Sequence, residues 1–156
     1  MTEALAQLAW ALLATCGFGL LFRAPLRDLP VAALGGALAW GAFLASKALT
    51  GSPNLAYFAA SFAVGVYAEF MAALLKRPAT LFILSAIIPL VPGGGMYYTM
   101  FHAVSGDASR AASAGFDTIL AAGGIAGGLA VASAASRILW LKKPRPRTPG
   151  HGRRTT

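Results

Sequence analysis

The sequence IIPLVPGGGMYY, residues 87–98, interrupts an apolar run that extends from Ala79 to Val104. Each proline removes a backbone N–H and clashes with the preceding helical turn, and the three glycines that follow add backbone freedom. A regular helix cannot continue through this stretch. Because the run of 26 residues exceeds the roughly 20 residues that a membrane-spanning helix needs, the pattern predicts a transmembrane helix that is broken inside the bilayer.

The composition favours a membrane protein. Of the 156 residues, 57% are hydrophobic and 12% are charged, and the mean hydropathy is +0.66. Soluble domains carry roughly 25% charged residues, and a chain this short cannot bury so much apolar surface in a core of its own. Lipid is therefore the expected solvent.

Charged residues divide the chain into five long apolar runs. The runs are too long and too evenly apolar for the strands of a membrane barrel, which alternate over about ten residues. We therefore expect an all-α polytopic membrane protein with five transmembrane helices, the fourth of them broken, in a transmembrane domain of residues 1–141. The runs are Ala4–Phe22, Leu29–Ser46, Asn54–Leu75, Ala79–Val104 and Ala114–Leu141.

The formal net charge of +8 comes largely from a Pro-rich basic tail, residues 142–156, which we expect to be disordered and cytoplasmic. With five crossings, eleven of the thirteen basic residues lie on one side of the membrane. Since basic loops stay in the cytoplasm, the N-terminus should lie on the opposite, outer side of the inner membrane. No stacking aromatic residues accompany the tail, so membrane lipid is the expected contact and nucleic acid is not an expected partner.

The break is the first candidate site. Its backbone groups must be surrounded by protein or by a water-filled cavity, because an unsatisfied group in hydrocarbon costs several kcal/mol. Broken helices form substrate sites in secondary transporters, where the N–H groups of a half-helix face an anion. The alternative is a simple kink, since proline is frequent in membrane helices. The expected substrate-binding residues are Pro89, Pro92, Gly93, Gly94, Gly95 and Tyr97.

Two acids inside apolar runs are candidates for proton coupling. Glu69 lies two helical turns before a basic loop, and a charge at a helix centre costs about 2.5–3.5 kcal/mol on insertion scales. It can carry a proton or bind a substrate amine, or it can pair with Arg77 or Arg27. Asp117 is the second candidate, and its alternative role is an ion pair with Arg110.

Small residues predict how the helices pack. The sequence GGIAGG, residues 123–128, contains two overlapping GxxxG patterns, at which membrane helices approach closely. We expect this contact to form within the chain, and contact between copies in a homo-oligomer is the alternative.

No catalytic or metal-binding motif stands out in the sequence. It lacks the GxSxG, HExxH and Walker patterns, and its one cysteine, Cys16, rules out a disulfide within the chain. We therefore expect neither an enzyme nor a metal or cofactor site.

Four stretches resemble the threonine/serine exporter (ThrE) family. The two central ones are AEFMAALLKRPAT, residues 68–80, and the segment from Ile88 to Tyr97. The loop at residues 23–25 and the segment at residues 117–128 fit the same pattern. The resemblance covers about residues 10–141. Within the family, the chain is similar to the small subunit, which matches the C-terminal membrane half of single-chain members.

The resemblance implies a secondary exporter of threonine and serine or of a dicarboxylate such as succinate. It also implies a partner, a larger membrane subunit with a soluble domain. Two roles stay open at this stage: a transporter subunit that forms part of the solute path, and a non-transporting assembly subunit that stabilises its partner.

Overall fold

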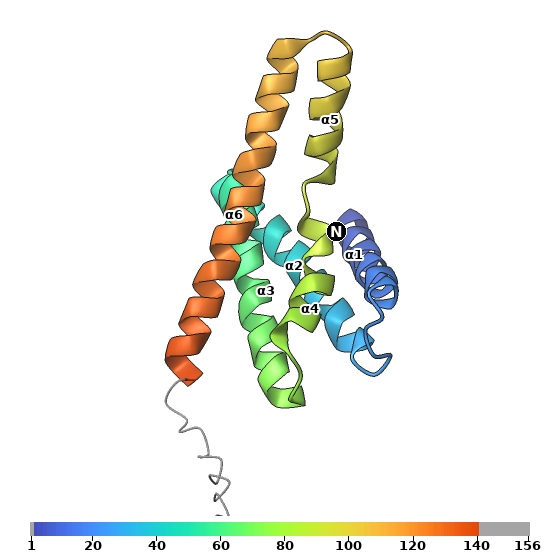
Figure 1. Cartoon of the computed structure of the whole chain (residues 1–156), viewed down its shortest axis with the longest axis vertical. Coiled ribbons are helices and arrows are strands. Elements are labelled where there is room, and N and C mark those ends of the chain that lie inside the picture. The colour runs from blue at the N-terminus through green and yellow to red at the C-terminus, as the bar shows by residue number, and fades with distance from the viewer. Residues whose placement is uncertain (1, 141–156) are drawn as a thin grey trace, which may run out of the picture.

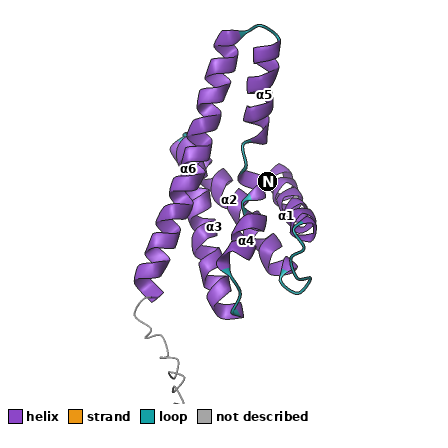
Figure 2. Ribbon diagram, in the orientation of Figure 1, coloured by secondary structure: helices purple, strands orange, loops and turns teal. Residues whose placement is uncertain are grey.

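The computed structural model describes residues 2–140, and within that range the regular structure is helical with no strand (Figure 2). The basic tail, which we expected to be disordered, lies outside the described residues. The elements are α1 (Thr2–Leu21), α2 (Leu29–Thr50), α3 (Pro53–Leu75), α4 (Ala79–Ala86), the 3₁₀ turn η1 (Ile88–Leu90), α5 (Gly93–Val104) and α6 (Ala108–Trp140).

Four of the described helices, α1, α2, α3 and α6, are long and apolar enough to cross a membrane. The segment from α4 to α5 forms a fifth span if its bent halves are counted together. Helices of 20, 22 and 23 residues, as in α1, α2 and α3, measure about 30–35 Å, which matches the hydrocarbon thickness of a bilayer. The expected all-helical polytopic fold with a broken fourth span is confirmed.

Turn-forming residues set the ends of the body helices. Gly51 has a φ of +66° and its N–H donates to the carbonyl of Lys47 at 3.0 Å, which ends α2. Pro53 then begins α3, where a missing N–H costs nothing. Lys76, with a φ of +53°, ends α3, and Pro78 precedes the first turn of α4.

Small residues bring the helices of the body close together. The buried apolar residues are mostly alanines, so the helix backbones approach one another as membrane helices do. A Cβ added at Gly36 of α2 would overlap Thr15 of α1, and one added at Gly128 of α6 would overlap Ser61 and the carbonyl of Phe58 on α3. The contact that we expected within the chain for the GxxxG segment is therefore present.

Residues 93–122, which we call the α5–α6 hairpin, project beyond the body formed by the other helices (Figure 1). Within this hairpin α5 packs on α6 and has no buried residue. The apolar run expected from Ala114 belongs to a longer helix that begins at Ala108. It begins there because the carboxylate of Asp107 accepts the backbone N–H of Arg110 at 3.0 Å and caps the helix.

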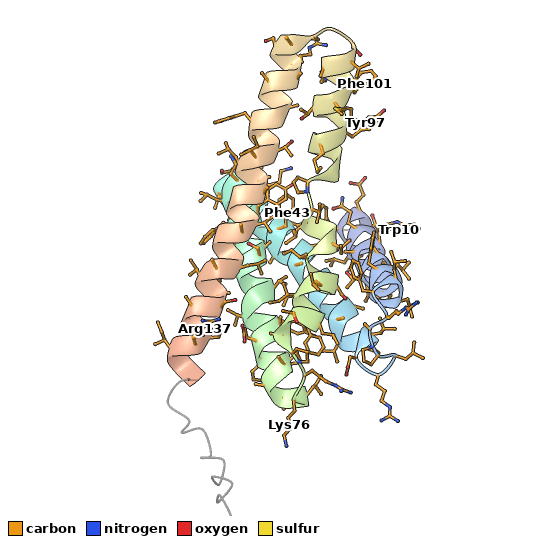
Figure 3. The ribbon with its side chains drawn as sticks, in the orientation of Figure 1. Trp10, Phe43, Lys76, Tyr97, Phe101 and Arg137 are labelled. Atoms are coloured by element: carbon orange, nitrogen blue, oxygen red, sulfur yellow. The ribbon has the colours of Figure 1, made fainter. Side chains whose placement is uncertain are left out.

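The loops place positive charge at one end of the molecule. The α1–α2 loop, the α3–α4 turn and the C-terminal end of α6 lie at the same end (Figure 1), which we call the basic end. Figure 3 shows Lys76 and Arg137 there. Within residues 2–140, the other basic residues of this end are Arg23, Arg27 and Arg77.

Candidate functional site

The break predicted from the sequence lies between α4 and α5. α4 ends at Ala86, residues Ile88–Leu90 form a single 3₁₀ turn, and α5 begins at Gly93. The two halves are bent by 49° relative to each other. Neither Pro89 nor Pro92 has an N–H to donate, so the helical hydrogen-bond ladder is interrupted at both.

The break leaves backbone groups without partners. Among residues 2–140, the N–H groups of Gly94 and Gly95 make no hydrogen bond. The residues four positions before them, Leu90 and Val91, precede α5, so the first turn of this helix has no intrahelical acceptor for these groups. On the other half, the carbonyls of Pro89 and Leu90 accept no backbone N–H from the described residues. The start of α5 therefore presents two free donors and the positive end of a helix dipole.

A cavity of about 560 Å³, which we call the break cavity, lies beside these groups. Its volume falls within the roughly 300–1,000 Å³ of small-ligand pockets. Its walls come from α2, α3, the break itself, α5 and α6. The expected site residues Pro89, Pro92, Gly93, Gly94 and Gly95 line it, together with the polar residues Asn54, Tyr57, Tyr98, Asp117 and Thr118.

Tyr97, which we expected among the substrate-binding residues, lies outside the break cavity. Its side chain is 64% exposed, and its ring centroid is 6.2 Å from that of Phe101. Figure 3 shows both side chains on the side of α5 that faces away from α6. The neighbouring Tyr98 lines the cavity instead, because one residue along a helix turns the side chain by about 100°.

Asp117 shares the break cavity with the free N–H groups of α5. The alternative that it pairs with Arg110 is wrong, since Nε of Arg110 lies 3.4 Å from Oδ2 of Asp107. Among the described residues Asp117 forms no ion pair. Its carboxylate is therefore available to a ligand in the cavity.

The three glycines of the break have different surroundings. A Cβ added at Gly93 or Gly94 would meet no atom within 4 Å, whereas one added at Gly95 would overlap Thr118 of α6. Gly95 therefore allows α5 to pack closely on α6. Gly93 and Gly94 leave open space beside the backbone.

Glu69, the other acid that we expected to act, lies in a separate cavity at the basic end. This basic-end cavity has a volume of about 340 Å³ and also contains Arg77 and Arg137. The expected alternative, an ion pair between Glu69 and Arg77 or Arg27, does not form; among the described residues Glu69 has no ion pair. The two acids are far apart, because Asp117 and Ser136 of the basic-end cavity are separated by about 28 Å along α6.

Asp28 is a buried acid that the sequence analysis did not single out. It is 5% exposed, and its Oδ2 lies 3.2 Å from Nε of Arg77. The pair joins the α1–α2 loop to the α3–α4 turn. Asp28 is the one acid in the loops of the basic end. An isolated acid among basic residues is the sequence feature that could have predicted this ion pair.

The family model described as threonine/serine exporter, ThrE, matches residues 7–135. The chain belongs to the ThrE family. The family suggested by the sequence is therefore confirmed. No curated protein and no solved structure matches the chain.

ThrE-family membership and the apolar helices together identify a multi-pass membrane protein of exporter type. The matched range contains every residue of the break cavity. It ends just before Ser136 and Arg137 of the basic-end cavity. The family match therefore does not extend to the α6 wall of the second cavity.

Proposed function

We propose that this chain is a subunit of a secondary-active exporter that moves small carboxylates, such as threonine or serine, across the inner membrane. The observation that carries the proposal is the break cavity. In it, two N–H groups at the start of a helix share a wall with a carboxylate, and none of these groups has a partner among residues 2–140. Such a cavity offers complementary groups to a solute that carries both a carboxylate and an ammonium.

The N–H groups of Gly94 and Gly95 would bind the carboxylate of the solute, because a helix start favours negative charge. Asp117 would bind the ammonium. A dicarboxylate such as succinate would bring its second negative charge toward Asp117, and like charges repel. The cavity therefore favours an amino acid over a dicarboxylate.

Asp117 and Glu69 are the two acids that we propose for proton coupling. We place the coupling step at Asp117, because it lies in the same cavity as the solute. A proton that enters from outside would then compete with the ammonium of the solute for one carboxylate. Such competition couples inward proton flow to outward solute movement.

The α5–α6 hairpin supports a larger partner subunit, as the family resemblance implies. Large apolar side chains of α5 are exposed, including Met96, Tyr97, Met100 and Phe101, on a helix that packs on α6. Such a face of a membrane helix can be covered by lipid or by the helices of a partner, and we assign it to the partner. The same observation favours the second candidate function, a non-transporting assembly subunit.

We propose that the basic end faces the cytoplasm and that the N-terminus lies outside. The loops of this end carry most of the basic residues near the membrane, and short basic loops stay in the cytoplasm. The basic-end cavity would then open toward the cytoplasmic pool of solute.

Export from vesicles tests the proposed site. The chain is reconstituted alone and with the membrane partner that co-purifies with it, and efflux of radiolabelled threonine is measured. The Pro89→Ala/Pro92→Ala double variant should heal the helix, return the Gly94 and Gly95 N–H groups to intrahelical bonds, and lower efflux about tenfold or more, since each charge-assisted hydrogen bond contributes about 1.5–3 kcal/mol.

Pro30→Ala is the matched control, because Pro30 is exposed in the first turn of α2, where proline is tolerated. It should export as the wild type does. Unchanged efflux in the double-proline variant would remove the substrate site from the break. Full efflux by the partner without this chain would favour the assembly role.

A further inference from the structure

The basic-end cavity gathers charged groups from separate parts of the chain. Glu69 comes from α3, Arg77 from the α3–α4 turn, and Ser136 and Arg137 from the last turns of α6. The remaining lining residues, Ala72, Ala73 and Ala79, have small side chains. The cavity is therefore lined by small side chains and by charged ones.

Asp28 holds Arg77 in place at the edge of this cavity. The ion pair is made by Nε of Arg77, and the side chain of Arg77 makes no hydrogen bond to the described residues. Its two terminal amino groups are therefore available as donors. A guanidinium held at one nitrogen is well prepared to bind an anionic group with the others.

Glu69 and Arg137 are unpaired charges of opposite sign on the walls of the same cavity. Neither forms an ion pair with the described residues. Charged groups in membrane helices normally pair with each other or face a functional cavity. The cavity therefore has one acid and two guanidinium groups that face a shared space of about 340 Å³.

We propose that the basic-end cavity is a second binding site, specific for a ligand that carries an anionic oxygen group and an ammonium a few bonds apart. Arg77 and Arg137 bind the anionic group, and Glu69 binds the ammonium. The hydroxyl of Ser136 donates to the carbonyl of Ser133 at 3.0 Å, so its oxygen accepts a further bond from the ammonium.

Two sources supply this chemistry, a free amino acid and the ethanolamine headgroup of a phospholipid. If the ligand is the amino acid, the site rests on the proposed function and serves as a loading site at the cytoplasmic end. It lies about 28 Å along α6 from Asp117, so one solute cannot occupy both cavities. The break cavity and the basic-end cavity would then be two separate binding sites for the same solute.

Equilibrium binding of radiolabelled threonine to the full-length chain in phosphatidylcholine nanodiscs tests the proposal. The wild type should show two classes of site. Glu69→Gln and Arg137→Gln should each remove the class of site in the basic-end cavity and leave the class in the break cavity unchanged. Arg110→Gln, which changes an exposed basic residue at the opposite end, is the control and should keep both classes.

An analogue separates ligand binding from a structural role of Glu69. The compound 3-hydroxybutyrate resembles threonine but lacks the ammonium. It should bind the wild type weakly and should bind Glu69→Gln at least as well, because the substitution removes a repulsive charge. A site that is merely distorted in Glu69→Gln would lose the analogue as well.

Nanodiscs that also contain phosphatidylethanolamine distinguish the two sources. If this lipid displaces threonine from the class of site that depends on Glu69, the headgroup is the ligand. Persistence of both classes of threonine site in Glu69→Gln and in Arg137→Gln would overturn the proposal. The double-proline variant should lose only the other class, so failure of the break cavity and failure of this site give different results.

Discussion

Gly94 and Gly128 are both helical glycines, yet their surroundings differ at the scale of single atoms. A Cβ at Gly94 meets nothing within 4 Å, whereas one at Gly128 overlaps Ser61 and the carbonyl of Phe58. The first glycine leaves room for a ligand, and the second allows α6 to contact α3.

We predict opposite outcomes for alanine at these two positions. Gly128→Ala should lower the free energy of unfolding by about 1–3 kcal/mol, the usual effect of overpacking. Gly94→Ala should change it by less than about 1 kcal/mol but should reduce threonine efflux, because the methyl group enters the break cavity. Thermal unfolding in detergent and efflux from vesicles measure the two effects. Normal efflux with Gly94→Ala would contradict the proposed solute position.

Asp117 and Glu69 also have different proposed roles, and single substitutions distinguish them. We predict that Asp117→Asn exports solute at a rate that no longer rises when an inward proton gradient is imposed, because the amide cannot carry the coupling proton. Glu69→Gln should export more slowly but keep its response to the gradient. Efflux measured with and without the gradient decides between them. A gradient response that disappears only in Glu69→Gln would place coupling in the basic-end cavity.

At the scale of helices, Asp107 decides where α6 begins. Its carboxylate accepts the N–H of Arg110 and holds the Arg110 side chain at 3.4 Å. We predict that Asp107→Ala destabilises the chain by about 1 kcal/mol through loss of the cap. Asp107→Asn keeps an acceptor oxygen and should lose less. Thermal unfolding of both variants checks this, and equal stability of Asp107→Ala and the wild type would show that the cap is unimportant.

The broken helix was predictable from local chemistry, because Pro89, Pro92 and the glycines act through their own backbone. The start of α6 was not predicted, since Ala114 begins the uncharged run but the cap lies further upstream at Asp107. Side-chain direction was also missed at the break. Tyr97 and Tyr98 are equivalent in sequence, and the packing of α5 on α6 selects Tyr98 for the cavity.

Contacts between distant segments were beyond the sequence pattern. Asp28 meets Arg77 because two loops share one end of the body, and Glu69 shares a cavity with Arg137 because α3 packs along α6. The ion pairs that the sequence offered as alternatives, Glu69 with Arg77 or Arg27 and Asp117 with Arg110, do not form among the described residues. The identity of the acids was informative, while their partners depended on tertiary packing.

At the scale of the whole molecule, the proposed orientation can be checked by labelling. Cys16 is the single cysteine, so Cys16→Ala provides a background without thiols. In that background we predict that Ser109→Cys, in the first turn of α6, reacts with a membrane-impermeant maleimide applied from outside. Leu26→Cys, at an exposed position of the basic end, should react only after the membrane is permeabilised. The reverse pattern would invert the orientation.

The close contact between α6 and α3 at Gly128 has a mechanical consequence. α6 is 33 residues long, and it forms a wall of the break cavity above this contact and of the basic-end cavity below it. A stiff rod that pivots about an intermediate point moves its two ends in opposite directions. Tilting of α6 about Gly128 would therefore widen the break cavity as it narrows the basic-end cavity, or the reverse. Alternating access requires a reciprocal motion of this kind.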